Sequence, residues 1–196
     1  LTWKLALRKF NSFVVNGTLN SETKIFVNSI SNCIISEDDM KTIESENYNI
    51  LDNVVLEILE GEETNDEYLK RKQKFIKSWN AMTALDDFGS GYNSEYALLT
   101  LEPNIIKIDR SIISGCDHDE SKSDIIEKLV QISAAKGILV LAEGVETRDE
   151  LKKVIECGVD LLQGFYFGKP SFEPQVCSEE TTKDILKMSA KARNKK

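Results

Sequence analysis

The chain has 196 residues, of which 41% are apolar and only three are proline. This length suits one ordinary domain, and the composition argues against a disordered chain. A formal net charge of −8 disfavours DNA and RNA as partners, although bound metal ions would still allow a small phosphorylated ligand. No apolar run approaches the roughly 18–20 residues that a membrane-spanning helix needs, so we expect no membrane segment in this chain.

The cysteines and the single histidine do not form a pattern typical of a metal site. Cys33, Cys116, Cys157 and Cys177 stand far apart, without a CxxC pair. This spacing predicts neither a zinc site nor a disulfide framework and favours a cytoplasmic location. His118 lies in a polar stretch, GCDHDESKSD, where we expect a solvated side chain and no His-based catalytic triad.

Six apolar, β-branched runs recur along the chain, at residues 24–30, 53–60, 82–89, 104–109, 138–146 and 159–168. Their almost continuous hydrophobicity predicts strands of a parallel sheet that is covered on both faces. Helical patterns lie between most of them, at residues 66–80, 94–102, 123–137 and 147–158. Because strand and helix alternate, the sequence predicts an α/β fold.

Several residues mark the expected ends of these helices. Thr147 and Glu150 have the spacing of a capping box at the start of the helix at 147–158. Gly137 and Gly158 are placed to stop two helices, and Asn80 is placed as a left-handed cap of a third.

Each predicted strand carries a polar residue at its carboxyl end: in order, Asn28, Glu57, Asp86 with Asp87, Lys107, Glu143 and Gln163. An open doubly wound sheet gathers its ligand-binding groups at one switch point. In a (β/α)₈ barrel, every strand contributes to the site at its carboxyl end. Because every predicted strand carries such a polar residue, the sequence favours a barrel over a doubly wound sheet.

Each of these residues also has an ordinary structural interpretation. Asn28 could begin a turn, Glu57 could be a surface position on an edge strand, and Lys107 could reach the surface beside Asp109. Glu143 and Gln163 could satisfy backbone groups, and ALDDFGSGYNS (84–94) is rich in turn residues. As one set, however, they supply the oxygen ligands that Mg²⁺ or Mn²⁺ prefers. A cation between Asp86 and Asp87 would also relieve their repulsion.

Four blocks of the sequence resemble, in order and spacing, the signature blocks of EAL-domain cyclic di-GMP phosphodiesterases. They are ALDDFGSGYNS (84–94), IIKIDRSII (105–113), VLAEGVET (140–147) and LLQGFYFGKP (161–170). FVNSIS (26–31) resembles the Asn-bearing strand of this family, and LEILEGE (56–62) resembles its Glu-x-Thr-Glu strand. The resemblance implies a TIM-type (β/α)₈ barrel of the EAL type.

The resemblance also implies a role for each matched residue. Asn28, Glu57 and Asp86 would bind a first metal ion, and Asp86 would bridge to a second ion held also by Asp87 and Glu143. Lys107, Glu143 and Gln163 would be catalytic: Lys107 beside the attacking water or a phosphate oxygen, and Gln163 beside the hydrated second ion. Glu60 would anchor the loop that follows Asp87, and Glu146 would play a similar supporting part.

The implied activity is hydrolysis of cyclic di-GMP to linear pGpG with two Mg²⁺ or Mn²⁺ ions, in bacterial second-messenger signalling. The implied assembly is a homodimer whose contact includes residues 86–95 and the helix after them, with a sensor or GGDEF domain possible upstream. Two alternatives stay open. One is a catalytically impaired EAL domain that acts as a cyclic di-GMP receptor or interaction module, and the other is a barrel enolase or aldolase that uses Lys107.

The sequence departs from the family pattern at several positions. Leu59, Ser90 and Asn104 replace commoner residues, none of them a metal ligand. The Glu-Ala-Leu strand is absent, so we expect the chain to begin inside the domain, with a partial barrel over 1–172 and a closing helix and basic tail over 173–196. Such a fragment would have exposed strand edges and would hydrolyse cyclic di-GMP poorly.

Overall fold

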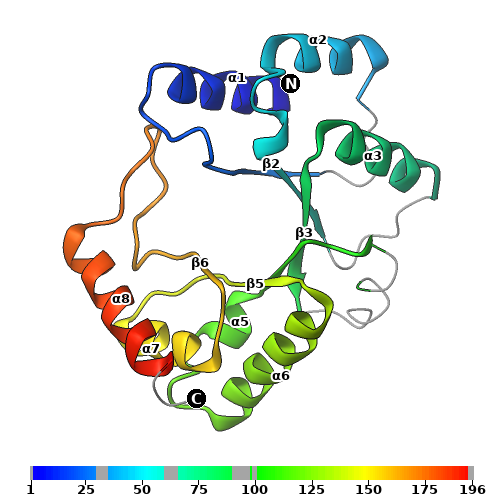
Figure 1. Cartoon of the computed structure of the whole chain (residues 1–196). Helices are drawn as coiled ribbons and strands as arrows, with labels where there is room; N and C mark the ends of the chain where they lie inside the picture. Colours follow the sequence, from blue (N-terminus) through cyan, green and yellow to red (C-terminus); the bar gives the residue numbers. More distant parts are fainter. Residues whose placement is uncertain (1, 30–34, 60–65, 90–97, 99–100, 194–196) are drawn as a thin grey trace. The chain divides into compact units, whose positions relative to one another are not determined.

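The computed structural model describes residues 2–29, 35–59, 66–89, 98 and 101–193. Glu60, Ser90 and most of the helix expected at 94–102 lie outside these residues. The helices are α1 (Thr2–Val15), α2 (Glu37–Asn47), the 3₁₀ helix η1 (Leu51–Asn53), α3 (Asp66–Trp79), α5 (Arg110–Ile113), α6 (Glu120–Lys136), α7 (Arg148–Cys157) and α8 (Glu179–Arg193). The strands are β1 (Ile25–Asn28), β2 (Val54–Leu59), β3 (Met82–Phe88), β4 (Ile105–Ile108), β5 (Leu139–Ala142) and β6 (Leu161–Leu162) (Figure 1).

The strands follow one another in the sheet in chain order, from β1 to β6. β1 pairs with β2 in parallel, with Asn28 opposite Glu57, and β5 pairs in parallel with both β4 and β6. Helices lie between β1 and β2, β2 and β3, β4 and β5, and β5 and β6, so the expected parallel α/β fold is confirmed. No helix in the described part of the chain is long and apolar enough to cross a membrane. The chain divides into two compact units, Leu1–Ala84 and Leu85–Lys196.

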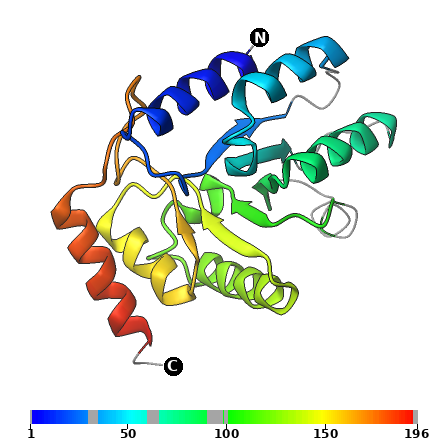
Figure 2. The same cartoon turned by 45° about the horizontal axis from the view of Figure 1, so that its top comes forward.

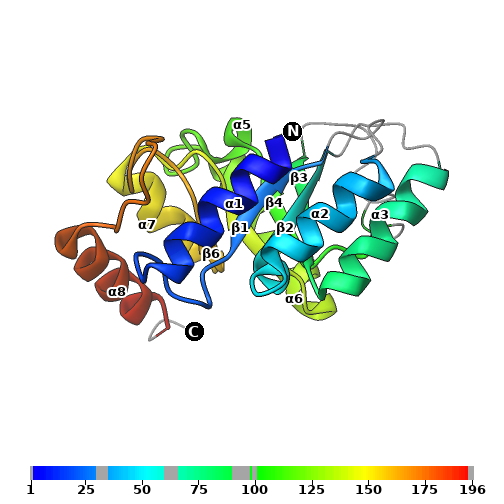
Figure 3. The ribbon, with the colours of Figure 1, turned by 90° about the horizontal axis from the view of Figure 1, so that it is seen from above.

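In the first unit, α1 and α2 lie side by side, and α1 runs along β1 (Figure 3). Leu7 from α1, Ile43 from α2 and Val54 from β2 are fully buried in one apolar cluster. Asn80 ends α3 with a left-handed φ of 53°, as predicted, because Asn tolerates this conformation better than most residues.

In the second unit, α7 and α8 pack against each other (Figure 2). Met188 of α8 joins the core that contains Leu151 and Val154 of α7. The Arg148 guanidinium also donates two hydrogen bonds to Asp184, at 2.8 and 3.2 Å. α8 is therefore part of the apolar core of this unit.

The helix ends of the second unit agree with the sequence. Gly137 and Gly158 end α6 and α7 with φ angles of 70° and 93°, which are unfavourable for residues that carry a Cβ. The capping box at the start of α7 is also confirmed, because the Thr147 side chain accepts from the Glu150 backbone and the Glu150 side chain accepts from the Thr147 backbone.

Glu150 does more than cap its own helix. Its carboxylate accepts backbone hydrogen bonds from Gly115, which follows α5, and from Glu146 and Thr147, which precede α7. Burial acts to raise the pKa of Glu150, but these hydrogen bonds outweigh it and lower the pKa below its usual value. One buried carboxylate therefore holds two connecting segments in place.

We expect Glu150→Gln to destabilise the protein by about 1–3 kcal/mol at neutral pH, because an amide cannot accept on both sides of the side chain. A lowered carboxyl pKa contributes stability above the unfolded-state value of about 4.3, and this contribution is lost as the pH falls through the folded-state value. The difference in urea unfolding between wild type and variant should therefore shrink in acid. Glu127→Gln, at an exposed position of α6, is the control. Equal, pH-independent effects of the two substitutions would contradict the role of Glu150.

Candidate metal centre

Asp86 and Asp87 lie near the carboxyl end of β3, where Asp86 is buried and Asp87 is half-buried. Side chains of a regular strand alternate between its two faces. Asp87 breaks this regularity, because its φ is 55°, and its backbone N–H donates to Asp86 Oδ1 at 3.1 Å. The irregular backbone brings two adjacent carboxylates close together.

Lys107 of β4 lies between carboxylates from two other segments. Its Nζ is 2.7 Å from Asp86 Oδ1 and 3.3 Å from Glu143 Oε2, and only 4% of its side chain is exposed. The interpretation of Lys107 as a surface residue is therefore wrong. Asp109 instead caps α5, accepting from the Ser111 backbone.

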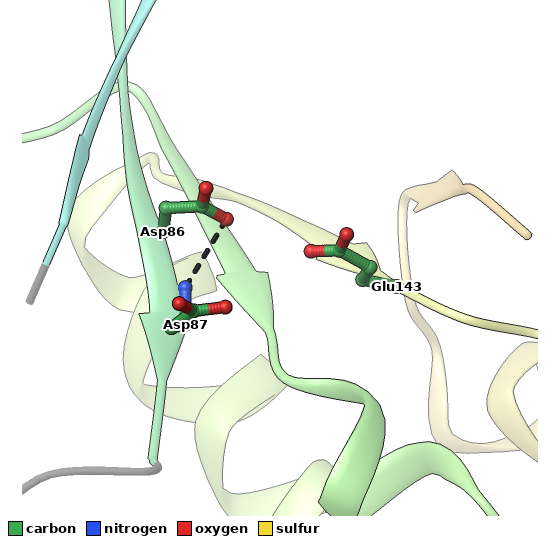
Figure 4. Close-up of side chains that lie close together, drawn as sticks. All are labelled: Asp86, Asp87 and Glu143. Atoms are coloured by element: carbon green, nitrogen blue, oxygen red, sulfur yellow. Dashed lines mark hydrogen bonds between the residues drawn. The ribbon is translucent and has the colours of Figure 1, made fainter. Parts of the chain in front are cut away.

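Glu143 directly follows β5, and its carboxylate points toward Asp86 and Asp87 (Figure 4). Burial raises the pKa of Glu143, and Asp86 and Asp87 add to this effect, whereas Lys107 opposes it. Glu143 Oε2 is buried and accepts no hydrogen bond from the residues that the structure describes, despite its distance of 3.3 Å from the Lys107 ammonium.

These carboxylates fit a hard divalent cation. Asp86, Asp87 and Glu143 each offer an oxygen, and the three oxygens lie within 4.8 Å of one another. Glu143 Oε2 is buried with only the Lys107 ammonium as an ion-pair partner among the described residues, so this oxygen could also bind a cation. Carboxylate oxygens are the ligands that Mg²⁺ and Mn²⁺ prefer. The structure thus brings Asp86, Asp87 and Glu143 together, and their role as metal ligands stays a prediction.

The turn that carries Glu143 is fixed to the segment that contains Gln163. The Val145 N–H donates to Gln163 O, and Val145 O accepts from the Tyr166 N–H, both at 3.0 Å. A Cβ at Gly164 would lie 2.1 Å from Val145 O, so only glycine allows this approach. The Gln163 backbone thus lies beside the turn, while its side chain is exposed and its catalytic role stays a prediction.

Asn28 and Glu57 lie in the first unit, at the carboxyl ends of β1 and β2. They are register partners, and the Ser29 N–H donates to Glu57 O at 2.8 Å. Glu57 is only 8% exposed, so its interpretation as a surface position is wrong, whereas Asn28 is exposed and its carbonyl accepts from Trp3 Nε1. The structure brings these two predicted ligands together, and their role as ligands stays a prediction.

Of the two expected supporting residues, Glu146 is described and pairs with Arg110, whose Nη2 lies 2.8 Å from Glu146 Oε1. The sequence interpretation assigned no role to Arg110, although it lies three residues after Lys107 within IIKIDRSII. That proximity was the available signal. It was missed because a single arginine after a strand is usually a solvated residue.

We expect Lys107→Met to destabilise the protein by about 3 kcal/mol or more at neutral pH, because Asp86 and Glu143 would lose a buried cationic partner. Lys107 also opposes the increase in the pKa of Glu143, so the variant should raise that pKa further. A raised carboxyl pKa lowers stability as the pH rises through it. The loss in the free energy of unfolding, measured with urea, should therefore be smaller near pH 5 than near pH 7.5. Lys152→Met, at an exposed position of α7, is the control, and an equal loss at both pH values would contradict the expectation.

Comparisons with known proteins identify the family of this chain. The family model described as "EAL domain" matches residues 3–170. The cyclic di-GMP phosphodiesterase PdeA of Borreliella burgdorferi is 36% identical over an alignment of 183 residues, and the match covers 87% of this chain and 26% of that protein. The probable cyclic di-GMP phosphodiesterase PdeG of Escherichia coli is 34% identical over 119 residues, 60% of this chain and 24% of that protein. The chain thus spans about a quarter of the length of these relatives.

Solved structures show the same fold. A standalone EAL protein of Vibrio cholerae in its c-di-GMP-bound form has a TM-score of 0.78 and 28% identity, with 92% of this chain and 78% of that chain covered. BlrP1 of Klebsiella pneumoniae, in a complex with manganese and cyclic di-GMP, has a TM-score of 0.71 and 25% identity, with 86% and 45% covered. From the matched blocks, the family model and these structures together, the chain belongs to the EAL-domain family.

Proposed function

We propose that this chain is a phosphodiesterase unit that hydrolyses cyclic di-GMP to linear pGpG with Mg²⁺ or Mn²⁺. The observation that carries the proposal is the group formed by Asp86, Asp87 and Glu143, with the Lys107 ammonium beside two of its members. The relatives named as cyclic di-GMP phosphodiesterases and the cyclic di-GMP complexes of EAL proteins support the choice of substrate.

The charge of the group supports a cation-dependent reaction. Three carboxylates and one ammonium leave a net negative site if all are ionised, and such a site repels a phosphodiester anion. Bound divalent cations would reverse this local charge and supply Lewis-acid assistance to hydrolysis. BlrP1 forms complexes that contain manganese or calcium together with cyclic di-GMP, which supports a site that holds both a cation and the substrate.

The residues of the chain have distinct parts in this proposal. Asp86, Asp87 and Glu143 would hold the cation, because their oxygens already converge. Lys107 keeps Asp86 and Glu143 directed toward a common point, and its ammonium would attract a phosphate oxygen of the substrate. Burial raises the pKa of Glu143, and a bound cation would favour its ionised form.

The remaining expectations stand as parts of the same proposal. A cytoplasmic location agrees with free Cys116, Cys157 and Cys177. The homodimer contact expected at residues 86–95 falls mostly outside the described residues, so it stays a prediction.

We expect Asp86→Asn to abolish hydrolysis and to weaken Mn²⁺ binding by at least about tenfold, because an amide carries no charge for the cation. Asp87→Asn should have a similar effect on Mn²⁺ binding, and it leaves the ion pair between Asp86 and Lys107 intact. Mn²⁺ affinity by calorimetry and pGpG formation by chromatography would be measured on folded protein. Asp124→Asn, at an exposed position of α6, is the control.

Undiminished hydrolysis by Asp86→Asn, or full hydrolysis in excess chelator, would overturn the proposed mechanism. Binding of cyclic di-GMP without hydrolysis, both by this chain and by a longer protein that includes a Glu-Ala-Leu strand, would instead identify a receptor, which is the alternative function.

We expect Glu57→Gln to weaken Mn²⁺ binding if Glu57 is a ligand, by about the factor measured for Asp87→Asn, because both substitutions remove one carboxylate charge. Because Glu57 is buried, the stability of the variant protein would be measured in parallel. Glu22→Gln, at an exposed position of the same unit, is the control. Unchanged Mn²⁺ affinity in folded Glu57→Gln would remove Glu57 from the predicted ligands.

A further inference from the structure

Arg110 occupies a fixed position directly after the strand that carries Lys107. It is the first residue of α5, its carbonyl accepts from the Ser114 N–H at 2.8 Å, and Asp109 caps the same helix. The Asp109 N–H in turn donates to Phe88 O at the end of β3. The backbone of Arg110 is thereby held between the ends of β3 and α5.

The side chain of Arg110 lies flat against Gly144. A Cβ built on Gly144 would be 2.5 Å from Arg110 Cγ, 2.8 Å from its Cβ and 2.9 Å from its Cδ. Gly144 directly follows Glu143 and has a φ of 75°, a conformation that favours glycine. The absence of a side chain at this position thus allows the arginine stem to cover the backbone that carries Glu143.

The guanidinium of Arg110 reaches the other end of the same turn, where Nη2 pairs with Glu146 Oε1 at 2.8 Å. Val145 between them is held by Gln163 and Tyr166, and the Glu146 N–H is held by Glu150. Arg110 therefore contacts the turn at Gly144 and at Glu146, on both sides of the buried Val145.

We infer that Arg110 is a positioning residue, which fixes the turn from Glu143 to Glu146 so that the Glu143 carboxylate faces Asp86 and Asp87. The ion pair is largely exposed, with 59% of the Arg110 side chain accessible, so its contribution to overall stability is small. The ion pair acts instead on the orientation of the Glu143 side chain. The expected loss of cation affinity on removal of Arg110 rests on the proposed function. The expected loosening of the turn does not.

The first test measures the turn without any cation. In excess chelator, Arg110→Ala should speed hydrogen exchange of the Val145 and Glu146 amides, and Arg110→Met, which keeps most of the stem, should speed it less. Arg148→Ala is the matched control, because it removes another ion pair of 2.8 Å with 57% of the arginine exposed. The inference would be overturned if Arg110→Ala left the exchange rate of these two amides unchanged. It would also be overturned if Arg148→Ala raised that rate equally.

The second test measures Mn²⁺ affinity by calorimetry. Arg110→Ala should weaken binding by about tenfold, the scale expected when a residue that orients a metal ligand is lost, and Arg148→Ala should leave the affinity unchanged. If the wild type binds Mn²⁺ and Arg110→Ala binds it equally well, the inference fails and the proposed function stands. If the wild type binds no Mn²⁺, the proposed function fails, and the exchange of the two amides decides the role of Arg110.

Discussion

The ion pairs of Lys107 with Asp86 and Glu143 are the interactions on which the candidate centre depends. Three carboxylates in a partly buried space repel one another. A buried ammonium 2.7 Å from one of them and 3.3 Å from another offsets part of this repulsion. The same contacts connect β3, β4 and the residue after β5, so the ends of these strands and the charges are ordered together.

The backbone around this centre is adapted to the charges at several points. Asp87 adopts a left-handed conformation, Gly144 accepts an arginine stem against its Cα, and Gly164 allows close approach to Val145. Asp87 interrupts the regular geometry of β3, whereas Gly144 and Gly164 lie in the turns that follow β5 and β6. They occur at the carboxyl ends of the strands, which is where parallel α/β proteins place their ligand-binding groups.

Much of this could be predicted from the sequence, because the responsible signals are local. The apolar runs indicated parallel strands, and the residues at their ends included Asp86, Lys107 and Glu143, which meet in the second unit. The capping box at Thr147 and the left-handed Asn80 follow from single-residue preferences. The burial of Lys107 and its partners could not be predicted in this way, since they depend on which strands become neighbours. The contact of Arg110 with Gly144 is of the same kind, because it joins residues whose spacing has no periodic pattern.

The connection between β6 and α8 is exposed, although α8 itself packs into the core. Phe172 and Val176 are almost fully exposed on this connection, at 97% and 94%, while Met188 beyond them is buried in the core. A protease that cuts the connection would break the covalent link to α8 but would leave its apolar contacts and the pair between Arg148 and Asp184 intact. The two fragments would then stay associated under native conditions and separate only in denaturant, so an intact native mass would not demonstrate an intact chain.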